Sequence, residues 1–319
     1  MNKTICLLLL PIVLLYGCSE PIAFEVDHNE EIIVNGMICP DSSISIHLSK
    51  SIPPTAATAF PNVDNAQITV FENNTEIGTT AYRGSGYYQL DYLPKVNHTY
   101  RIEVAIDGHP TIEAEDTVPE LVPDFTARHI YAYDTTVLDN GWSVRRYQLY
   151  TVTFETPLPK PSWLGGLVHA HYFDHDSIYQ ASEKYFGYNF QSIDPYFDQK
   201  RGEFDSYTNT YGYGDFSPIL PAPASYTYAF EFGYQTYQRE YSGRYTRYDL
   251  TASVVNGSTT YDQYLQSYIA SKKYEPDPED WFPFGQSTQL YSNIKNANGI
   301  FAAYTVRQVA FPPLKDEIF

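Results

Sequence analysis

Apolar and polar residues alternate along the first third of the chain with the period of two that is typical of β-strands. Ile44, Ile46 and Leu48, for example, are separated by single polar residues. Similar runs, divided by turn residues, predict about seven short strands between residues 31 and 118. Strands of this length and spacing are typical of an immunoglobulin-like or transthyretin-like β-sandwich.

Two dipeptides in this region predict tight turns. Asp107-Gly108 lies between two alternating runs, and it predicts a hairpin turn in which both central residues have positive φ. Asn73-Asn74 predicts a second tight turn. Residues 51–65 contain three prolines and are expected to form a long loop between strands.

Pro119 and Pro123 bracket a short stiff connector, which we take as the domain boundary. Beyond it, residues 124–319 are predicted to form a second, larger β domain, so the expected fold class is all-β with two domains. Residues 177–223 are rich in Tyr, Asp, Gly and Ser, and we expect irregular hairpins or a functional excursion there. The strands expected in this domain are Tyr147–Phe154, Leu167–Phe173, Tyr226–Phe232, Tyr245–Val255 and Phe301–Val309.

One segment of the second domain has the period of a helix. Tyr261, Tyr264, Leu265 and Tyr268 recur at helical spacing, and prolines follow from residue 276. Thr260 and Gln263 fit a capping box at the start of this run. The pattern predicts a helix over residues 260–273, with its aromatic stripe packed on a sheet.

The first 17 residues have the layout of a bacterial secretory signal, in which Lys3 precedes an apolar run too short to span a bilayer permanently. The run ends in Leu14-Leu15-Tyr16-Gly17-Cys18, which resembles the lipobox of bacterial lipoproteins. We therefore expect residues 1–17 to be a signal peptide, Cys18 to carry acyl chains such as palmitate, and residues 18–30 to form an acidic tether. Each methylene of an acyl chain that enters the bilayer contributes about 0.8 kcal/mol, so several chains anchor a protein stably.

Composition limits the kinds of partner. The formal net charge is -18, which would repel nucleic acid and anionic headgroups. Once Cys6 has left with the signal and Cys18 carries lipid, Cys39 remains alone, so no internal disulfide is expected, and Cys39 itself is predicted to be buried. The 31 tyrosines suit either a β-rich fold with half-buried rings or a broad recognition surface.

His169-Ala170-His171, followed by Asp174 and His175, is the cluster that most resembles a metal site. On a strand, His169 and His171 lie on the same face, and a following turn can bring Asp174 or His175 round to them. Imidazole and carboxylate ligands suit zinc or another divalent ion. The alternative is an exposed strand end that leads into a polar turn, because sequence spacing does not fix the tetrahedral geometry that zinc prefers.

Tyr207, Tyr211 and Tyr213 form the candidate contact cluster, with Gly212 and Gly214 beside them. Tyrosines on glycine-flanked loops can stack on a sugar or seal a protein interface. The alternative is a poorly ordered loop without a binding role.

Several motifs resemble one known family. They are Ile33-Val34-Asn35-Gly36 after the tether, Tyr261-x-x-Tyr264-Leu265, Tyr291-Ser292-Asn293-Ile294, and Gly299-Ile300-Phe301-Ala302-Ala303-Tyr304. Together with Cys18, they resemble the family of Bacteroidetes outer-membrane lipoproteins known as domain of unknown function 4249. The resemblance implies an accessory lipoprotein, often encoded beside a TonB-dependent outer-membrane receptor, and it implies no catalytic role.

These observations lead to three hypotheses of function. The first is a surface-exposed outer-membrane lipoprotein that binds a small molecule, sugar or peptide, or the receptor itself, and assists TonB-dependent nutrient uptake without catalysis or a cofactor. The second is a metal-dependent hydrolase that uses the His169 cluster. The third is a structural or adhesive surface protein.

Overall fold

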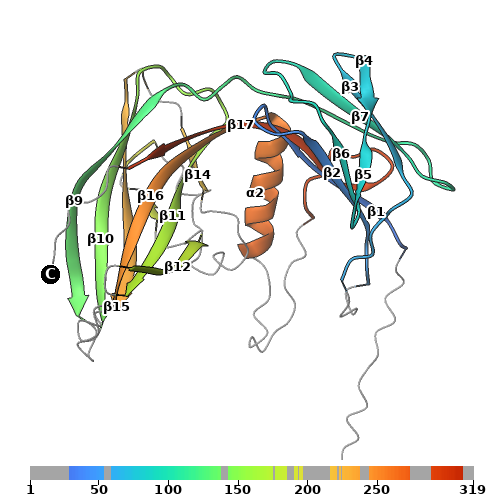
Figure 1. Ribbon diagram of the computed structural model, residues 1–319. Coiled ribbons are helices and arrows are strands. Elements are labelled where there is room, and N and C mark those ends of the chain that lie inside the picture. The colour runs from blue at the N-terminus through green and yellow to red at the C-terminus, as the bar shows by residue number, and fades with distance from the viewer. Residues whose placement is uncertain are drawn as a thin grey trace, which may run out of the picture.

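The computed structural model describes residues 29–53, 59–137, 143–174, 177–184, 190–192, 194–196, 216–220, 223, 225–237, 244–273 and 289–311. Strands dominate this part of the chain, and one helix, α2, stands between two groups of strands (Figure 1). The all-β prediction is therefore confirmed.

The N-terminal group is a sandwich of two antiparallel sheets. Named in chain order, β1 to β8 correspond to strands A, B, C, C′, D, E, F and G, so the sheets have the orders A-B-E-D and C′-C-F-G. This is the immunoglobulin arrangement, and it decides between the two sandwiches that the sequence left open. The first sheet contains β1 (Ile32–Ile38), β2 (Ile44–Lys50), β6 (Tyr87–Leu90) and β5 (Ala81–Gly84); the second contains β4 (Thr75–Thr79), β3 (Gln67–Glu72), β7 (Thr99–Ala105) and β8 (Ile112–Thr117).

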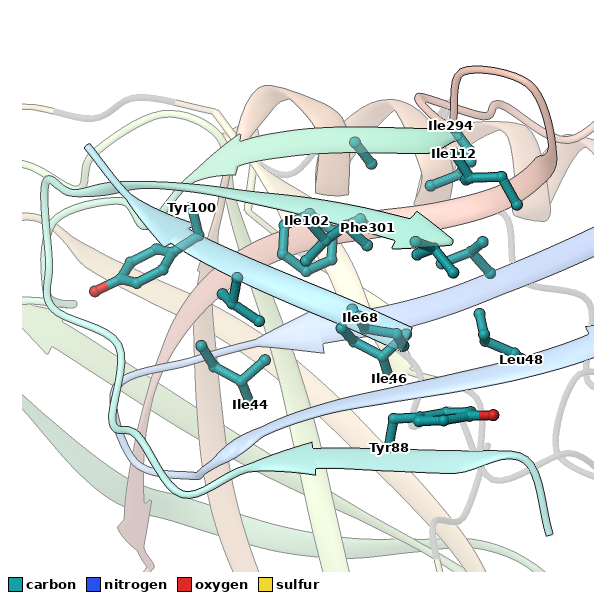
Figure 2. Packing of buried hydrophobic residues seen from close by; sticks show 14 of the residues in the cluster. Ile44, Ile46, Leu48, Ile68, Tyr88, Tyr100, Ile102, Ile112, Ile294 and Phe301 are labelled. Carbon is teal, nitrogen blue, oxygen red and sulfur yellow. The ribbon is translucent and has the colours of Figure 1, made fainter. Parts of the chain in front are cut away.

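The core of this sandwich follows the alternation in the sequence. In β2, Ile44, Ile46 and Leu48 are fully buried, whereas Ser45 is exposed and His47 is half-buried. Figure 2 shows these three aliphatic side chains packed among residues of the facing sheet. The buried Cys39 lies at the end of β1, as predicted.

The turns agree with the sequence in one case and differ in the other. Asn73 and Asn74 have φ of 48° and 68°, as the two central residues of a tight hairpin turn require. At Asp107-Gly108 only Gly108 has a positive φ, 80°, and the His109 N–H donates to the Ile106 carbonyl. The expectation of two positive φ values there was wrong, because a glycine at the third position alone satisfies a type II turn.

Tyr100 makes the tyrosine corner that is typical of immunoglobulin-like sandwiches. Its hydroxyl accepts a hydrogen bond from the Lys95 N–H at 2.8 Å and donates one to the Glu72 carboxylate at 2.5 Å. Burial alone would raise the pKa of Glu72, but hydrogen bonds from Tyr100, Tyr92 and Lys95 outweigh it and lower this pKa to about 2. Glu72 is therefore ionised at neutral pH, and it holds the corner in place.

The C-terminal group also has two layers, whose apolar faces meet in a second core. Tyr150, Val152 and Phe154 from one layer and Leu164 and Val254 from the other are buried there. The strand β9 was not predicted, because its sequence has few aliphatic residues. One layer contains β13 (Phe190–Ser192), β15 (Thr227–Tyr237), β10 (Ser143–Phe154) and β9 (Phe125–Val137); the other contains β12 (Ser177–Lys184), β11 (Ser162–Asp174), β14 (Phe216–Ile219), β16 (Arg244–Gly257) and β17 (Asn298–Ala310).

The last strand, β17, belongs to both sandwiches. Its first half pairs with β1 in parallel, with Ile33 opposite Asn298 and Ile38 opposite Ala303. Its second half pairs with β16 antiparallel. The result is one nine-stranded sheet that runs through both groups (Figure 1). The boundaries predicted at residues 118 and 124 stay a prediction, but β17 contributes to both cores.

Helix α2 (Thr259–Lys273) lies where a helix was predicted. Its cap is Ser258, however, whose Oγ accepts a hydrogen bond from the Tyr261 N–H at 3.0 Å. The predicted capping box at Thr260 was wrong, because the chain already turns helical at Thr259. The Tyr261 ring packs on Tyr304 of β17, with ring centroids 5.4 Å apart. Within the described residues, no helix is long and apolar enough to cross a membrane.

Candidate functional site

A hollow of about 430 Å³ lies on the outer face of the N-terminal sandwich, over β2, β6 and β5. Cross-strand register brings its walls together, since Ser45 of β2 lies opposite Gln89 of β6. Strand β5 is the edge of the nine-stranded sheet, so the hollow is open on that side. Its lining residues are Ser45, Arg83, Gly84, Ser85, Tyr87 and Gln89.

Tyr87 is the aromatic element of this hollow, and 51% of it is exposed. The ring is supported from one side by His47, with ring centroids 4.6 Å apart. An exposed ring that is braced in this way offers a ligand a large apolar surface at little cost in conformational entropy.

The turn that closes the hollow has an unusual backbone. Gly84, Ser85 and Gly86 have φ of 99°, 50° and 76°, and Ser85 is a residue type that seldom adopts such values. A Cβ on Gly86 would lie 2.5 Å from the Leu48 carbonyl oxygen, so only glycine fits there. The Leu48 N–H in turn donates to the Gly86 carbonyl at 2.9 Å. Residues held in sparsely populated φ regions concentrate at functional sites.

Two further tyrosines, Tyr82 on β5 and Tyr88 on β6, anchor these strands behind the hollow. The Tyr82 hydroxyl donates to Asp64 at 2.6 Å, and this hydrogen bond raises the pKa of Tyr82. The Tyr88 hydroxyl donates to the Val63 carbonyl at 2.9 Å, and burial raises the pKa of Tyr88. The Tyr82 bond fixes β5, the short edge strand on which Arg83 lies, and the Tyr88 bond fixes β6 beside it.

The C-terminal motifs of the sequence form a structural joint away from this hollow. The Asn293 side-chain amide donates to the carbonyl of Phe301 at 2.8 Å and to that of Glu115 at 3.1 Å. Its carbonyl oxygen accepts from the Phe301 N–H at 3.0 Å. Asn293 therefore joins β17 to β8, and the signature Tyr291-Ser292-Asn293-Ile294 has a role in folding.

Asp116 ties three elements together at the same joint. Its carboxylate accepts hydrogen bonds from the Ala303 N–H of β17, at 2.7 Å, and from the Ser258 hydroxyl at the start of α2. Burial raises the pKa of Asp116, and hydrogen bonds from Ser258, Thr117 and Ala303 oppose that effect. The joint therefore contains a half-buried carboxylate whose partners come from both sandwiches.

The connector is fastened as well. Asn256 and Thr305 both donate to the Glu120 carbonyl, at 2.8 and 2.7 Å, and Arg307 Nε donates to the Val122 carbonyl at 3.0 Å. The hollow is thus carried on a sandwich whose linkage to the rest of the chain is held by several hydrogen bonds.

A known family profile, described as "Domain of unknown function (DUF4249)", matches residues 19–309. The chain belongs to the DUF4249 family. This confirms the family that the motifs indicated. That DUF4249 proteins are Bacteroidetes outer-membrane lipoproteins stays a prediction.

Comparison with solved structures finds 21 chains that match this DUF4249 protein. One is the crystal structure of a protein from Corynebacterium diphtheriae described as membrane anchored, with 8% sequence identity. The match covers 70% of this chain and 54% of that one, and its TM-score of 0.20 is too low to carry an argument. The DUF4249 chain thus spans about half the length of that protein. No curated protein matches the chain.

The predicted metal residues of the DUF4249 chain are only partly within the described structure. His169 and His171 lie two residues apart on β11, so they share one face of the sheet, and Asp174 is the last residue of that strand. His175 lies outside the described residues. Among the side chains that the structure describes, no group of three or more His, Cys, Asp and Glu residues is placed to hold a metal ion.

The sheet register adds two residues that the sequence did not point to. His169 lies opposite Glu183 of β12 on one side and opposite Asp249 of β16 on the other. Residues directly opposite one another in an antiparallel pair share a face, with Cα atoms about 5 Å apart. The backbone therefore places two acidic positions beside His169. A local motif could not reveal them, since all three come from different strands.

The other predicted site residues of the DUF4249 protein, Tyr207, Tyr211, Tyr213 and Cys18, lie outside the described residues. Sequence reasoning also missed the hollow. The sequence did contain a signal for it. Tyr87 and Gln89 alternate along β6 with Tyr88 and Leu90, which face the core, so Tyr87 and Gln89 belong on the outer face.

Proposed function

We propose that this DUF4249 protein is a lipid-anchored, surface-exposed binding protein that assists a TonB-dependent receptor in nutrient uptake and performs no catalysis. The observation that carries the proposal is the hollow over β2, β6 and β5. It combines a braced, exposed tyrosine with polar groups on a rigid sheet, which is the composition of a recognition site.

Two features of the sequence support the cellular part of this proposal. Cys18 follows a signal-like segment and precedes an acidic tether, which is the arrangement of an acylated lipoprotein. The family resemblance supports the receptor, because lipoproteins of this kind are often encoded beside TonB-dependent barrels. The outer membrane and the cell surface follow from that resemblance.

The test is to isolate the full chain from mildly solubilised membranes of the source cells through a tag at its C-terminal end. We expect a TonB-dependent receptor to co-purify, because the accessory and the barrel act on the same ligand. Mass spectrometry of the intact protein should show a chain that starts at Cys18 and carries acyl groups. The Cys18→Ala variant should lose the acyl mass and move to the soluble fraction.

Two results would contradict the proposal. An unacylated chain released into the medium would remove the anchor. An acylated chain on the surface that brings down no TonB-dependent receptor would favour the structural or adhesive alternative. A Cys39→Ala variant, which changes the buried cysteine directly after β1, is the matched control and should stay membrane-bound.

A second candidate function is the metal-dependent hydrolase, and the register on β11 favours it. His169 is flanked by Glu183 and Asp249 on neighbouring strands, and His171 lies on the same face. One or two imidazoles with carboxylates form a ligand set that zinc accepts. The geometry of such a site would need the strands to bring these groups to about 2 Å from the ion.

A zinc titration against a chromophoric chelator tests this second candidate. If the site exists, the full chain competes for one equivalent of zinc, and both His169→Ala and Asp249→Asn weaken the affinity at least tenfold. His109→Ala is the control, because His109 is an exposed residue of the β7–β8 turn. Equal zinc affinity of all four proteins would remove the hydrolase hypothesis.

A further inference from the structure

We propose that the hollow over β2, β6 and β5 binds a saccharide, with one pyranose ring of an oligosaccharide stacked on Tyr87. This inference rests on the proposed binding function and names the class of its ligand.

Tyr87 supplies the aromatic surface of the hollow. Tyr87 is half exposed on the outer face of β6, and His47 packs beside it at 4.6 Å between ring centroids. The flat side of a pyranose carries C–H groups that pack on an aromatic face, while its hydroxyls point to the edge and stay available for hydrogen bonds. A tyrosine that is fixed at one side and open at the other suits that geometry.

Polar side chains line the hollow together with this ring. Ser45 lies opposite Gln89 in the β2–β6 register. On its other side Gln89 lies opposite Ala81 of β5, and Arg83 follows two residues later on that strand. These residues offer a hydroxyl, a primary amide and a guanidinium group at one hollow. The hydroxyl and the amide can both donate to and accept from vicinal hydroxyls, and the guanidinium donates to them. An aliphatic or lipid ligand would leave these groups unpaired.

The charge of the hollow differs from that of the chain as a whole. The chain as a whole carries a net charge of -18, yet the hollow is lined by one arginine and by no carboxylate. Calcium and magnesium sites are built mainly from carboxylate and other oxygen ligands, and the arginine repels cations, so a cation is a poor fit. Nucleic acid would be repelled by the rest of the surface. A neutral, hydroxyl-rich ligand does not need carboxylates and is not repelled by the negative charge of the chain.

The shape and the rigidity of the hollow also suit an oligosaccharide. The volume of about 430 Å³ falls within the range of roughly 300–1,000 Å³ for small-molecule sites. The hollow opens at the edge strand β5, so an oligosaccharide can run across it with further units outside. The Gly84-Ser85-Gly86 turn is fixed against Leu48, which means that the site is formed before the ligand arrives and little binding energy is lost in ordering it.

The experiment uses the full chain in detergent and an array of neutral oligosaccharides that covers α- and β-glucans, xylans, mannans and galactans, with tetraalanine as a peptide probe. Binding is detected by saturation-transfer NMR, and the dissociation constant is measured by calorimetry. We expect at least one oligosaccharide to bind, with a dissociation constant between micromolar and millimolar. Tyr87→Ala and Gln89→Ala should each weaken it at least tenfold, and Tyr87→Phe should retain most of the affinity.

Phe60→Ala is the matched control, because Phe60 is also aromatic and 56% exposed but does not line the hollow. Its affinity should equal that of the unchanged chain. Saccharide binding that is unchanged in Tyr87→Ala and Gln89→Ala would place the ligand elsewhere and overturn the inference. The inference would also be overturned if no oligosaccharide in the array bound, or if tetraalanine alone bound. In those cases a co-purifying receptor would still support the proposed function, whereas a saccharide bound without any receptor would uphold this inference and refute the accessory role.

Discussion

Replacing Gly299 by alanine is expected to lower the free energy of unfolding by about 4 kcal/mol. Gly299 has φ of 113°, and a Cβ at this position would lie 2.0 Å from the Val34 carbonyl oxygen. The strained φ costs about 1–2 kcal/mol for a residue with a side chain. The clash adds about 1–3 kcal/mol, because it falls on the backbone of β1, directly opposite Gly299, and not on a flexible side chain.

Chemical denaturation monitored by circular dichroism measures this loss. Gly108→Ala is the matched control: Gly108 has φ of 80°, but its added Cβ would meet nothing within 4 Å. It should lose only about 1 kcal/mol, the cost of the backbone conformation. If Gly299→Ala lost no more than Gly108→Ala, the parallel pairing of β1 with β17 would not exist in solution.

Replacing Phe301 by alanine is expected to cost about 4 kcal/mol of stability. Phe301 is fully buried and belongs to the first core, and its ring is among the side chains that Figure 2 labels there. Its removal leaves a cavity between the two sheets of the N-terminal sandwich, although Phe301 itself comes from the last strand. Urea denaturation should therefore show the N-terminal sandwich losing stability from a change near the other end of the described chain.

A double-mutant cycle with Gly36 identifies the contact. A Cβ on Gly36 would lie 2.9 Å from Phe301 Cδ2, so Gly36→Ala alone must displace the ring and is expected to cost about 1–2 kcal/mol. With the ring removed, the same methyl group fills part of the cavity. The two losses should therefore fall short of additivity by about 1 kcal/mol. Strict additivity would mean that the two residues are not neighbours. Leu93→Ala, at a site 58% exposed, should change stability by less than about 0.5 kcal/mol.

Much of the N-terminal sandwich follows from local patterns. The alternation in β2 assigned Ile44, Ile46 and Leu48 to the core, and Asn73-Asn74 marked a turn that the structure contains. Both signals depend on residues that are close in sequence. The helix was predicted for the same reason. Its cap was placed two residues late, because Thr260 has Gln263 three residues after it, as a capping box requires, whereas Ser258 has Tyr261 at that distance.

The parts that were missed depend on distant residues. Three features depend on which strands pair and in what register. They are the parallel pairing of β17 with β1, the positions of Asp249 and Glu183 beside His169, and the pairing of Ser45 with Gln89 at the hollow. Alternation shows which side of a strand is buried, but it does not show which strand lies beside it. The immunoglobulin order was open for the same reason until the pairing was known.

The strand that is shared by both sandwiches also determines when the N-terminal sandwich can be completed during synthesis. The ribosome synthesises β1 early in translation. Its neighbour β17, which pairs with the free edge of β1, is synthesised only when residues 298–303 emerge. Until then the nascent chain carries an unsatisfied sheet edge, which is the surface that invites misassembly with other chains and recruits chaperones. A premature stop codon anywhere upstream of β17 would therefore damage the half of the protein that had already been translated.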